Sequence, residues 1–161
     1  MNHMKPAETL KALIETSKVK SSMPIKRMVI FGIFAGAYIA FAGAGANMAA
    51  YGLLSSTETF GLGKILSGTI FTVGLIMVVL GGAELFTGNT TMIAAVIDKR
   101  ITVSSMLKNW VIVYICNFIG GVLIAFMVYY SGVLNSGEGM LGAMTVKIAA
   151  GHQEKHRKGT K

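Results

Sequence analysis

Residues 65–97 read ILSGTIFTVGLIMVVLGGAELFTGNTTMIAAVI. From Ile65 to Ala83 every residue is apolar or small, over a length sufficient to cross a bilayer. Polar residues interrupt the segment between Glu84 and Thr91, and apolar residues resume at Met92. Backbone that leaves a helix at membrane depth exposes amide and carbonyl groups, which are costly to leave unpaired in hydrocarbon. The segment therefore predicts a broken membrane-spanning helix whose break is buried in protein or lines a polar path, as in a pore or carrier protomer.

The composition agrees with an all-α membrane protein. Hydrophobic residues make up 53% of the chain and charged residues only 14%, against about a quarter charged in soluble domains. Three segments are long and apolar enough to span a bilayer: residues 28–54, 65–83 with an extension to 97, and 111–130. A fourth apolar segment, residues 140–150, is too short and contains Lys147. The first 27 residues lack an apolar core, so we expect no cleavable signal peptide.

The position of the positive charges predicts the orientation of the chain. Basic residues precede the first span and lie between the second and third spans: Lys5, Lys11, Lys18, Lys20, Lys26 and Arg27, then Lys99, Arg100 and Lys108. The positive-inside rule places such loops in the cytoplasm. We therefore expect a multi-pass protein of the inner (plasma) membrane with a cytoplasmic N-terminus. Nucleic-acid binding is the alternative for so basic a chain, but these residues flank hydrophobic spans and do not form a patch with interleaved aromatic residues.

Three regions follow from this pattern. Residues 1–27 form a basic cytoplasmic leader, in which Pro6 to Thr16 has the spacing of a short amphipathic helix. Residues 28–131 hold the three spans. Residues 132–161 are expected to form an outer loop, a partial fourth helix and a basic tail. His152 and His156 in the tail have the spacing of a helical metal pair, but no third ligand accompanies them, so we predict no metal site.

Small and polar residues inside the spans predict close helix packing. Gly32 and Gly36 begin a stripe of small residues, continued by Ala40 and Ala44, which would let another helix approach closely. Asn117 lies in the third span and is followed by Gly120. An asparagine at this depth needs a partner, and we expect Asn117 to hydrogen-bond to a neighbouring helix, with contact to a substrate as the alternative.

Two groups of residues resemble the formate/nitrite transporter family, which includes formate, nitrite and hydrosulfide channels. The first is GGAELFTGN at residues 81–89, and the second is Lys108-Asn109-Trp110 followed by Tyr114, Asn117 and Gly120-Gly121. The resemblance implies an aquaporin-like fold of six spans in two inverted three-helix repeats, with an Ω loop breaking the second span. It also implies a homo-pentamer in which every protomer has its own pore. This chain would supply the first repeat and the start of a fourth helix, as an apparently truncated protomer.

The same resemblance assigns roles to residues of the broken span. Apolar pore constrictions would come from Phe71 and Leu75 on the helix before the break and from Leu85 and Phe86 within it. Thr87 would offer its hydroxyl to the anion between them. Three residues would support the loop, namely Glu84, Gly88 and Asn89, and we expect the Glu84 carboxylate to bond backbone amides. The family's central histidine and vestibule lysine have no assigned counterpart in this sequence.

The sequence thus predicts a channel or transporter protomer for small monovalent anions, in contact with the lipid bilayer and without a cofactor. The alternative is a small, non-conducting structural or regulatory membrane subunit. An enzyme is not expected, because the sequence offers no nucleophile with an adjacent base, no phosphate-binding glycine loop and no metal cluster.

Overall fold

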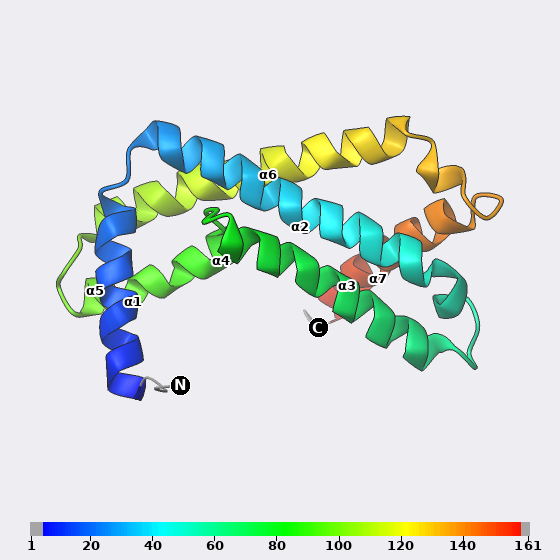
Figure 1. Cartoon of the computed structure of the whole chain (residues 1–161), viewed down its shortest axis with the longest axis horizontal. Coiled ribbons are helices and arrows are strands. Elements are labelled where there is room, and N and C mark those ends of the chain that lie inside the picture. Colours follow the sequence, from blue (N-terminus) through cyan, green and yellow to red (C-terminus); the bar gives the residue numbers. More distant parts are fainter. Residues whose placement is uncertain (1–4, 159–161) are drawn as a thin grey trace. The chain divides into compact units, whose positions relative to one another are not determined.

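The computed structural model describes the backbone of residues 5–158 and the side chains of residues 5–150. All regular secondary structure in this range is helical (Figure 1). The helices are α1 (Pro6–Ser21), α2 (Ile25–Leu54), α3 (Phe60–Leu80), α4 (Phe86–Asn89), η1 (Thr90–Met92), α5 (Ile93–Ile97), α6 (Val103–Tyr130), η2 (Val133–Asn135) and α7 (Met140–Lys158). The prediction of an all-α chain is confirmed.

Three helices of the described part, α2, α3 and α6, are long and apolar enough to cross a membrane. They correspond to the three predicted spans, although α6 begins at Val103 and not at residue 111. Its first turns carry polar residues such as Lys108, so the continuous apolar stretch in the sequence marks only the later part of the helix. Helix α7 likewise continues beyond residue 150, where the prediction ended it. The predicted basic tail and its histidines lie outside the residues whose side chains are described.

Helix α1 is longer than the leader helix predicted from the sequence, because it continues to Ser21. Pro6 stands at its first position, where a missing N–H costs nothing. The carboxylate of Glu8 accepts a hydrogen bond from the Lys5 backbone N–H at 2.8 Å. Lys18 and Lys20 lie in the last turn, where positive charge complements the helix dipole.

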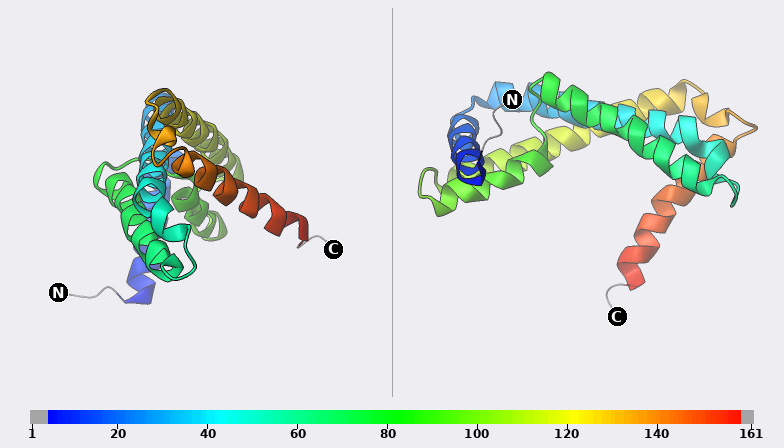
Figure 2. Two further views of the ribbon diagram at one scale, coloured as in Figure 1. Left: turned by 90° about the vertical axis from the view of Figure 1, so that its right-hand side faces the viewer. Right: turned by 60° about the horizontal axis from the view of Figure 1, so that its bottom comes forward.

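The helical path breaks after α3, at the position that the sequence predicts. Gly82 adopts a φ of 58°, in the left-handed region that favours glycine. The Gly82 N–H donates to the Val79 carbonyl at 3.2 Å and the Ala83 N–H to the Val78 carbonyl at 2.9 Å. These two bonds form a Schellman motif, which satisfies the last carbonyls of a helix and stops it. The right-hand view of Figure 2 shows the chain leaving the helix there.

The chain divides into two compact units, which we describe separately. Unit 1 comprises residues 1–38 and 78–122, and unit 2 comprises residues 39–77 and 123–161. In unit 1, α1 lies beside α5 (Figure 1). The most deeply buried apolar side chains of unit 1 come from four different elements: Ala35, Met92, Ala95 and Val113.

Within unit 1, the first half of α2 and the first part of α6 touch backbone to backbone at glycines. A Cβ atom on Gly36 would lie 1.9 Å from the Asn117 carbonyl oxygen, and one on Gly120 would lie 2.0 Å from the Ile33 carbonyl oxygen. A Cβ on Gly32 would lie 2.7 Å from the Cβ of Cys116. No side chain larger than hydrogen fits at these distances, so the glycines fix the separation of the two helices.

Unit 2 contains the second half of α2, most of α3, the end of α6, η2 and α7. Its buried cluster consists of Ala50, Leu54 and Met144, with Tyr51 and Ile148 packed against it. Helix α2 runs through this part of unit 2 without interruption as far as Leu54.

Candidate functional site

The non-helical loop between α3 and α4 belongs to unit 1, and its backbone groups are paired with the surrounding helices. The Glu84 N–H donates to the Phe31 carbonyl of α2 at 3.2 Å. The Phe86 N–H donates to the Asn117 Oδ1 of α6 at 2.8 Å. Loop backbone at membrane depth is tolerated where such partners bury it in protein. The break between α3 and α4 is therefore stabilised by specific hydrogen bonds to α2 and α6.

Asn117 joins three segments of unit 1. Its Nδ2 donates to the Gly32 carbonyl of α2 and to the Glu84 carbonyl of the loop, each at 2.8 Å. Its Oδ1 accepts the Phe86 N–H. The expected hydrogen bond to a neighbouring helix is present, and the bonds to the loop are additional. One amide side chain thus holds α2, α6 and the loop in register.

Glu84 is 4% exposed and does not bond backbone amides, contrary to the expectation from the sequence. Its Oε2 accepts hydrogen bonds from the Lys20 Nζ at 3.1 Å and from the Asn89 Nδ2 at 2.8 Å. The nearby amides of Glu84 and Phe86 already donate elsewhere. A lysine from α1 supplies the opposite charge, so the carboxylate is neutralised by an ion pair.

The ion pair belongs to a network of four side chains, Lys20, Glu84, Asn89 and Asn109, which we call the polar network. The Lys20 Nζ also donates to the Asn89 Oδ1 at 2.6 Å, and the Asn89 Nδ2 donates to the Asn109 Oδ1 at 2.8 Å. Asn89 and Asn109 are 0% and 1% exposed. No buried side-chain nitrogen or oxygen in the described part of the chain lacks a hydrogen-bond partner. Every fully buried nitrogen and oxygen of the network therefore has a partner, which is the condition under which buried polar groups stabilise a fold.

Lys20 and Asn109 are site residues that the sequence did not single out. Lys20 looked like one of several leader lysines, and 64 residues separate it from Glu84. Asn109 stands out in the sequence only as a member of the group Lys108-Asn109-Trp110 that carries the family resemblance. The one available signal was the lone carboxylate of Glu84 in an apolar region, which required a buried partner of opposite charge.

Thr87 lies at the start of α4 with an exposed side chain. The neighbouring hydroxyls are engaged, because Thr90 Oγ1 donates to the Thr87 carbonyl and Thr91 Oγ1 to the Gly88 carbonyl, both at 2.7 Å. The Thr87 hydroxyl makes no hydrogen bond within residues 5–150. It is the hydroxyl of this helical turn that is available to a solute.

Leu85 and Phe86 are half-buried at the same place. The Phe86 ring meets two aromatic rings of α6 edge to face: Trp110 at a centroid distance of 6.0 Å and Tyr114 at 5.4 Å. The Trp110 Nε1 donates to the Asn89 carbonyl at 2.8 Å. An apolar side chain and an unengaged hydroxyl are therefore neighbours in the first turn of α4, which directly follows the loop that carries the neutralised Glu84 carboxylate.

The other two predicted constriction residues belong to unit 2. Phe71 and Leu75 lie on α3, and their side chains are 40% and 45% exposed. Within unit 2, the Phe71 ring faces Gly43 of α2, where a Cβ atom would lie 3.9 Å from it. Their assignment to a constriction remains a prediction from the family resemblance, as do the roles of Leu85, Phe86 and Thr87.

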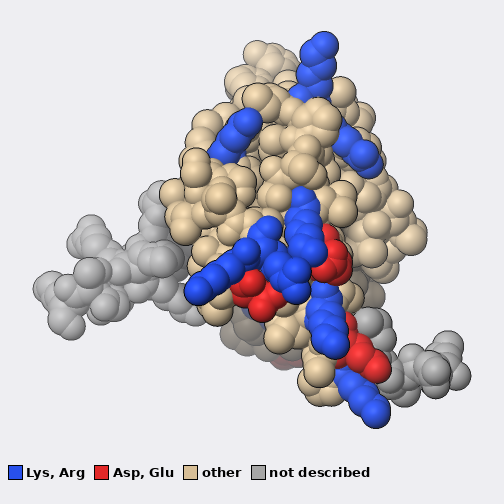
Figure 3. Space-filling view, turned by 90° about the vertical axis from the view of Figure 1, so that its left-hand side faces the viewer, with Lys and Arg blue, Asp and Glu red and all other residues tan. Residues whose placement is uncertain are grey.

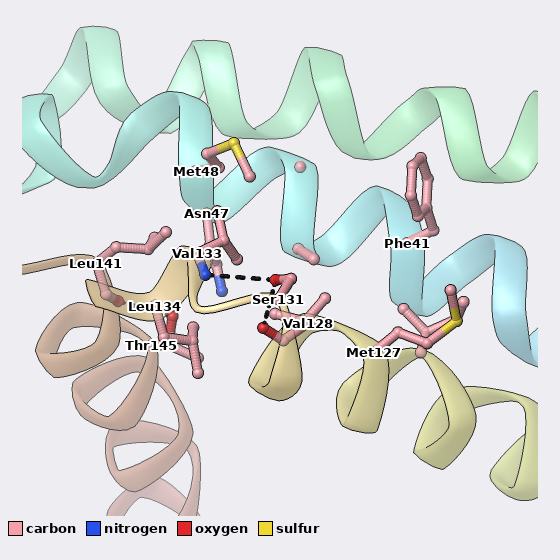
Figure 4. Close-up of a pocket in the computed structure, with 13 residues that line it drawn as sticks. Phe41, Asn47, Met48, Met127, Val128, Ser131, Val133, Leu134, Leu141 and Thr145 are labelled. Atoms are coloured by element: carbon pink, nitrogen blue, oxygen red, sulfur yellow. Dashed lines mark hydrogen bonds between the residues drawn. The ribbon is translucent and has the colours of Figure 1, made fainter. Parts of the chain in front are cut away.

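Unit 2 also holds a cavity of about 600 Å³ between the second half of α2, the end of α6, η2 and the start of α7 (Figure 4). The described residues that line the cavity are mostly apolar, including Phe41, Met48 and Met127, and none of them is charged. The Ser131 hydroxyl in its wall is engaged with the Val128 carbonyl at 2.8 Å. The cavity thus offers no charge to an anion. No group of metal-binding side chains occurs among the described residues.

Comparison with known proteins identifies the type of protein to which this loop belongs. The family model for the formate/nitrite transporter matches residues 7–158. The chain belongs to the formate/nitrite transporter family. Members of this family are transporters and channels rather than enzymes, and three candidate spans in the described part make this chain a multi-pass membrane protein.

Three relatives from the formate/nitrite transporter family illustrate the similarity. A probable formate transporter of Methanothermobacter thermautotrophicus is 36% identical over 143 residues, covering 88% of this chain and 52% of the relative. The formate channel FocA of Haemophilus influenzae is 37% identical over 131 residues, covering 78% and 43%. The formate channel BtFdhC of Bacillus thuringiensis is 37% identical over 149 residues, covering 91% and 56%. The chain spans about half the length of the curated relatives it matches.

Proposed function

We propose that this chain is a protomer of a membrane channel for small monovalent anions, with formate as the first candidate and nitrite and hydrosulfide as further ones. The relatives named as formate channels support formate, and the family name supports formate and nitrite. The observation that carries the proposal is the start of α4, where the Thr87 hydroxyl is exposed and unengaged among the described residues, next to apolar Phe86 and a neutralised Glu84.

The physical argument concerns the cost of dehydrating an anion. Apolar side chains at a constriction oppose the charged form of the solute, because they replace no part of its hydration shell. A hydroxyl between constrictions offers a replacement hydrogen bond. An unpaired carboxylate there would repel the anion, and the ion pair of Glu84 with Lys20 removes this repulsion. In the proposed pathway Leu85 and Phe86 form one constriction, Phe71 and Leu75 contribute to the apolar barrier, and Thr87 binds the anion.

The proposed assembly is the homo-pentamer of the family, each protomer having an aquaporin-like fold of two inverted repeats. Many large apolar side chains of the described helices are exposed, such as Val79, Leu80 and Phe118 at 76%, 82% and 67%. Exposed apolar surface of this extent fits contact with lipid and with neighbouring protomers. A non-conducting structural or regulatory subunit is less consistent with membership of a family of channels and transporters.

We propose that the protein lies in the plasma membrane with its N-terminus in the cytoplasm. Figure 3 shows Lys and Arg side chains gathered on the face that carries α1 and α5. Exposed basic residues of unit 1 include Lys11, Lys26, Arg27, Lys99 and Lys108. Cytoplasmic loops carry such an excess of positive charge.

Anion flux into proteoliposomes tests the role of Thr87. We expect Thr87→Val to lower formate flux by roughly tenfold or more, since one hydrogen bond to a charged group contributes about 1.5–3 kcal/mol, and Thr87→Ser to retain it. Thr91→Val serves as the matched control, because the Thr91 hydroxyl is also exposed but bonds the Gly88 carbonyl. Flux of Thr87→Val equal to that of Thr91→Val would remove Thr87 from the mechanism.

A further inference from the structure

One face of α6 contacts Phe86, the first residue of α4, through three consecutive positions of a helical stripe, Trp110, Tyr114 and Asn117. We infer that Trp110 and Tyr114 position the ring of Phe86, and that this pair, the aromatic bracket, sets the size of the anion that passes. The inference rests on the proposed function, in which Phe86 lines the pathway. Trp110 and Tyr114 act through Phe86 and are therefore positioning residues.

The geometry holds Phe86 at both its backbone and its ring. Its N–H is bonded to Asn117 at 2.8 Å. Its ring lies at 78° to the plane of Trp110 and at 74° to that of Tyr114, so both contacts are of the edge-to-face kind that aromatic pairs favour. A phenylalanine has two side-chain torsions, and rotation about the first would move the ring away from both partners. One helix thus fixes the position of this side chain.

The two members of the aromatic bracket differ in how they are themselves held. Trp110 is half-buried, and its indole N–H donates to the Asn89 carbonyl at 2.8 Å. Asn89 belongs to the polar network, so Trp110 is tied to the most buried polar part of unit 1. Tyr114 is 60% exposed, and its hydroxyl makes no hydrogen bond within residues 5–150. Tyr114 can therefore be altered with little effect on packing, which makes it the better residue to test.

Removing a member of the aromatic bracket should change the selectivity between anions and not only the flux. Formate and acetate carry the same charge and differ by one methyl group. A Phe86 ring that is held in place leaves less room for the larger anion, whereas a ring that can rotate away leaves more. Loss of one edge-to-face contact should therefore raise the ratio of acetate flux to formate flux, by roughly two- to tenfold for one aromatic pair.

The transport experiment compares formate and acetate flux in proteoliposomes holding the full chain. We expect Tyr114→Leu and Phe86→Ala to raise the acetate-to-formate ratio. Tyr114→Phe, which keeps the ring, and Phe118→Leu, which removes an exposed ring of the same helix outside the bracket, should leave it unchanged. A raised ratio in Phe86→Ala but not in Tyr114→Leu would overturn the bracket and leave the proposed function standing. An unchanged ratio in Phe86→Ala, or a wild-type chain that passes neither anion, would overturn the proposed function as well.

A spectroscopic measurement tests the contacts independently of transport. Trp110 is the only tryptophan of the chain, so all indole fluorescence comes from the bracket. We expect collisional quenching of this fluorescence by acrylamide to increase in Phe86→Ala and to stay at the wild-type level in Phe118→Leu. The same signal shows whether Tyr114→Leu keeps its fold. Unchanged quenching in Phe86→Ala would overturn the contact on which the inference depends.

Discussion

Replacing Lys20 by methionine should destabilise the protein far more than replacing the lysine two positions before it. Lys20 makes two hydrogen bonds in the polar network, to Glu84 at 3.1 Å and to Asn89 at 2.6 Å. Methionine preserves the length and the apolar stem of the side chain but removes the charge. The Glu84 carboxylate, whose side chain is 6% exposed, would keep only the hydrogen bond from the Asn89 amide.

The magnitude follows from the burial of the pair. Removing one partner of a buried ion pair costs about 3–5 kcal/mol, because the other charge stays behind without compensation. The side chain of Lys20 is 22% exposed, so water reaches it in part and we expect a value near the lower end, about 3 kcal/mol. Glu84→Gln keeps hydrogen-bonding capacity and should cost about 1–2 kcal/mol. The double variant should cost about as much as Glu84→Gln alone, so the coupling energy should equal the cost of Lys20→Met, about 3 kcal/mol.

The assay is equilibrium unfolding in mixed detergent micelles, followed by circular dichroism for the wild type, both single variants and the double variant. Lys18→Met is the matched control, because Lys18 pairs with Glu15 at 2.6 Å on the exposed side of the same helix. Such surface pairs contribute about 0–1 kcal/mol. The reasoning would be refuted if Lys20→Met cost no more than Lys18→Met, or if the two substitutions at Lys20 and Glu84 were additive.

Three further predictions concern the helix contact and the loop. Gly36→Ala should cost about 3 kcal/mol or more in thermal unfolding, because its Cβ would lie 1.9 Å from a backbone oxygen, whereas Gly121→Ala, with no atom within 4 Å, should be neutral or slightly stabilising. Asn117→Leu leaves an amide and two carbonyls without their partner, and should cost about 3 kcal/mol and raise hydrogen exchange at the loop amides. Gly82→Ala should lower the free energy of unfolding by about 1–2 kcal/mol, because the backbone φ of 58° at this position is unfavourable for alanine. Gly88→Ala, with no neighbouring atom within 4 Å of the added Cβ, should leave the stability unchanged. Equal melting temperatures for these two variants would contradict the argument.

The sequence predicts the spans and the break because both depend on local composition. A run of apolar residues as long as 65–83 requires a membrane or a large core, and the glycine and polar residues that follow it end the helix within a few positions. The structure adds the reason for the end, the left-handed conformation of Gly82. Helix ends are harder to predict where polar residues continue a helix past the apolar run, as at the start of α6.

The composition of the site could be predicted less completely. The loop and its threonines are visible in the sequence, but the partner of Glu84 comes from α1, 64 residues earlier, and no local pattern connects the two. Trp110 illustrates a second difficulty. An indole near the end of a span fits a membrane interface equally well, yet here its N–H donates to the Asn89 carbonyl. A hydrogen bond of this kind depends on packing that the sequence of one helix does not contain.

The bonds of Asn117 also bear on the order in which the chain enters the membrane. The loop at residues 81–85 is synthesised before Asn117, and until that residue emerges from the ribosome the Glu84 carbonyl and the Phe86 N–H lack the partner that they have in the finished fold. Hydrocarbon supplies no replacement for it. The second span therefore cannot settle in lipid as a completed element by itself, and we expect the insertion machinery to hold the loop in an aqueous environment until the third span follows.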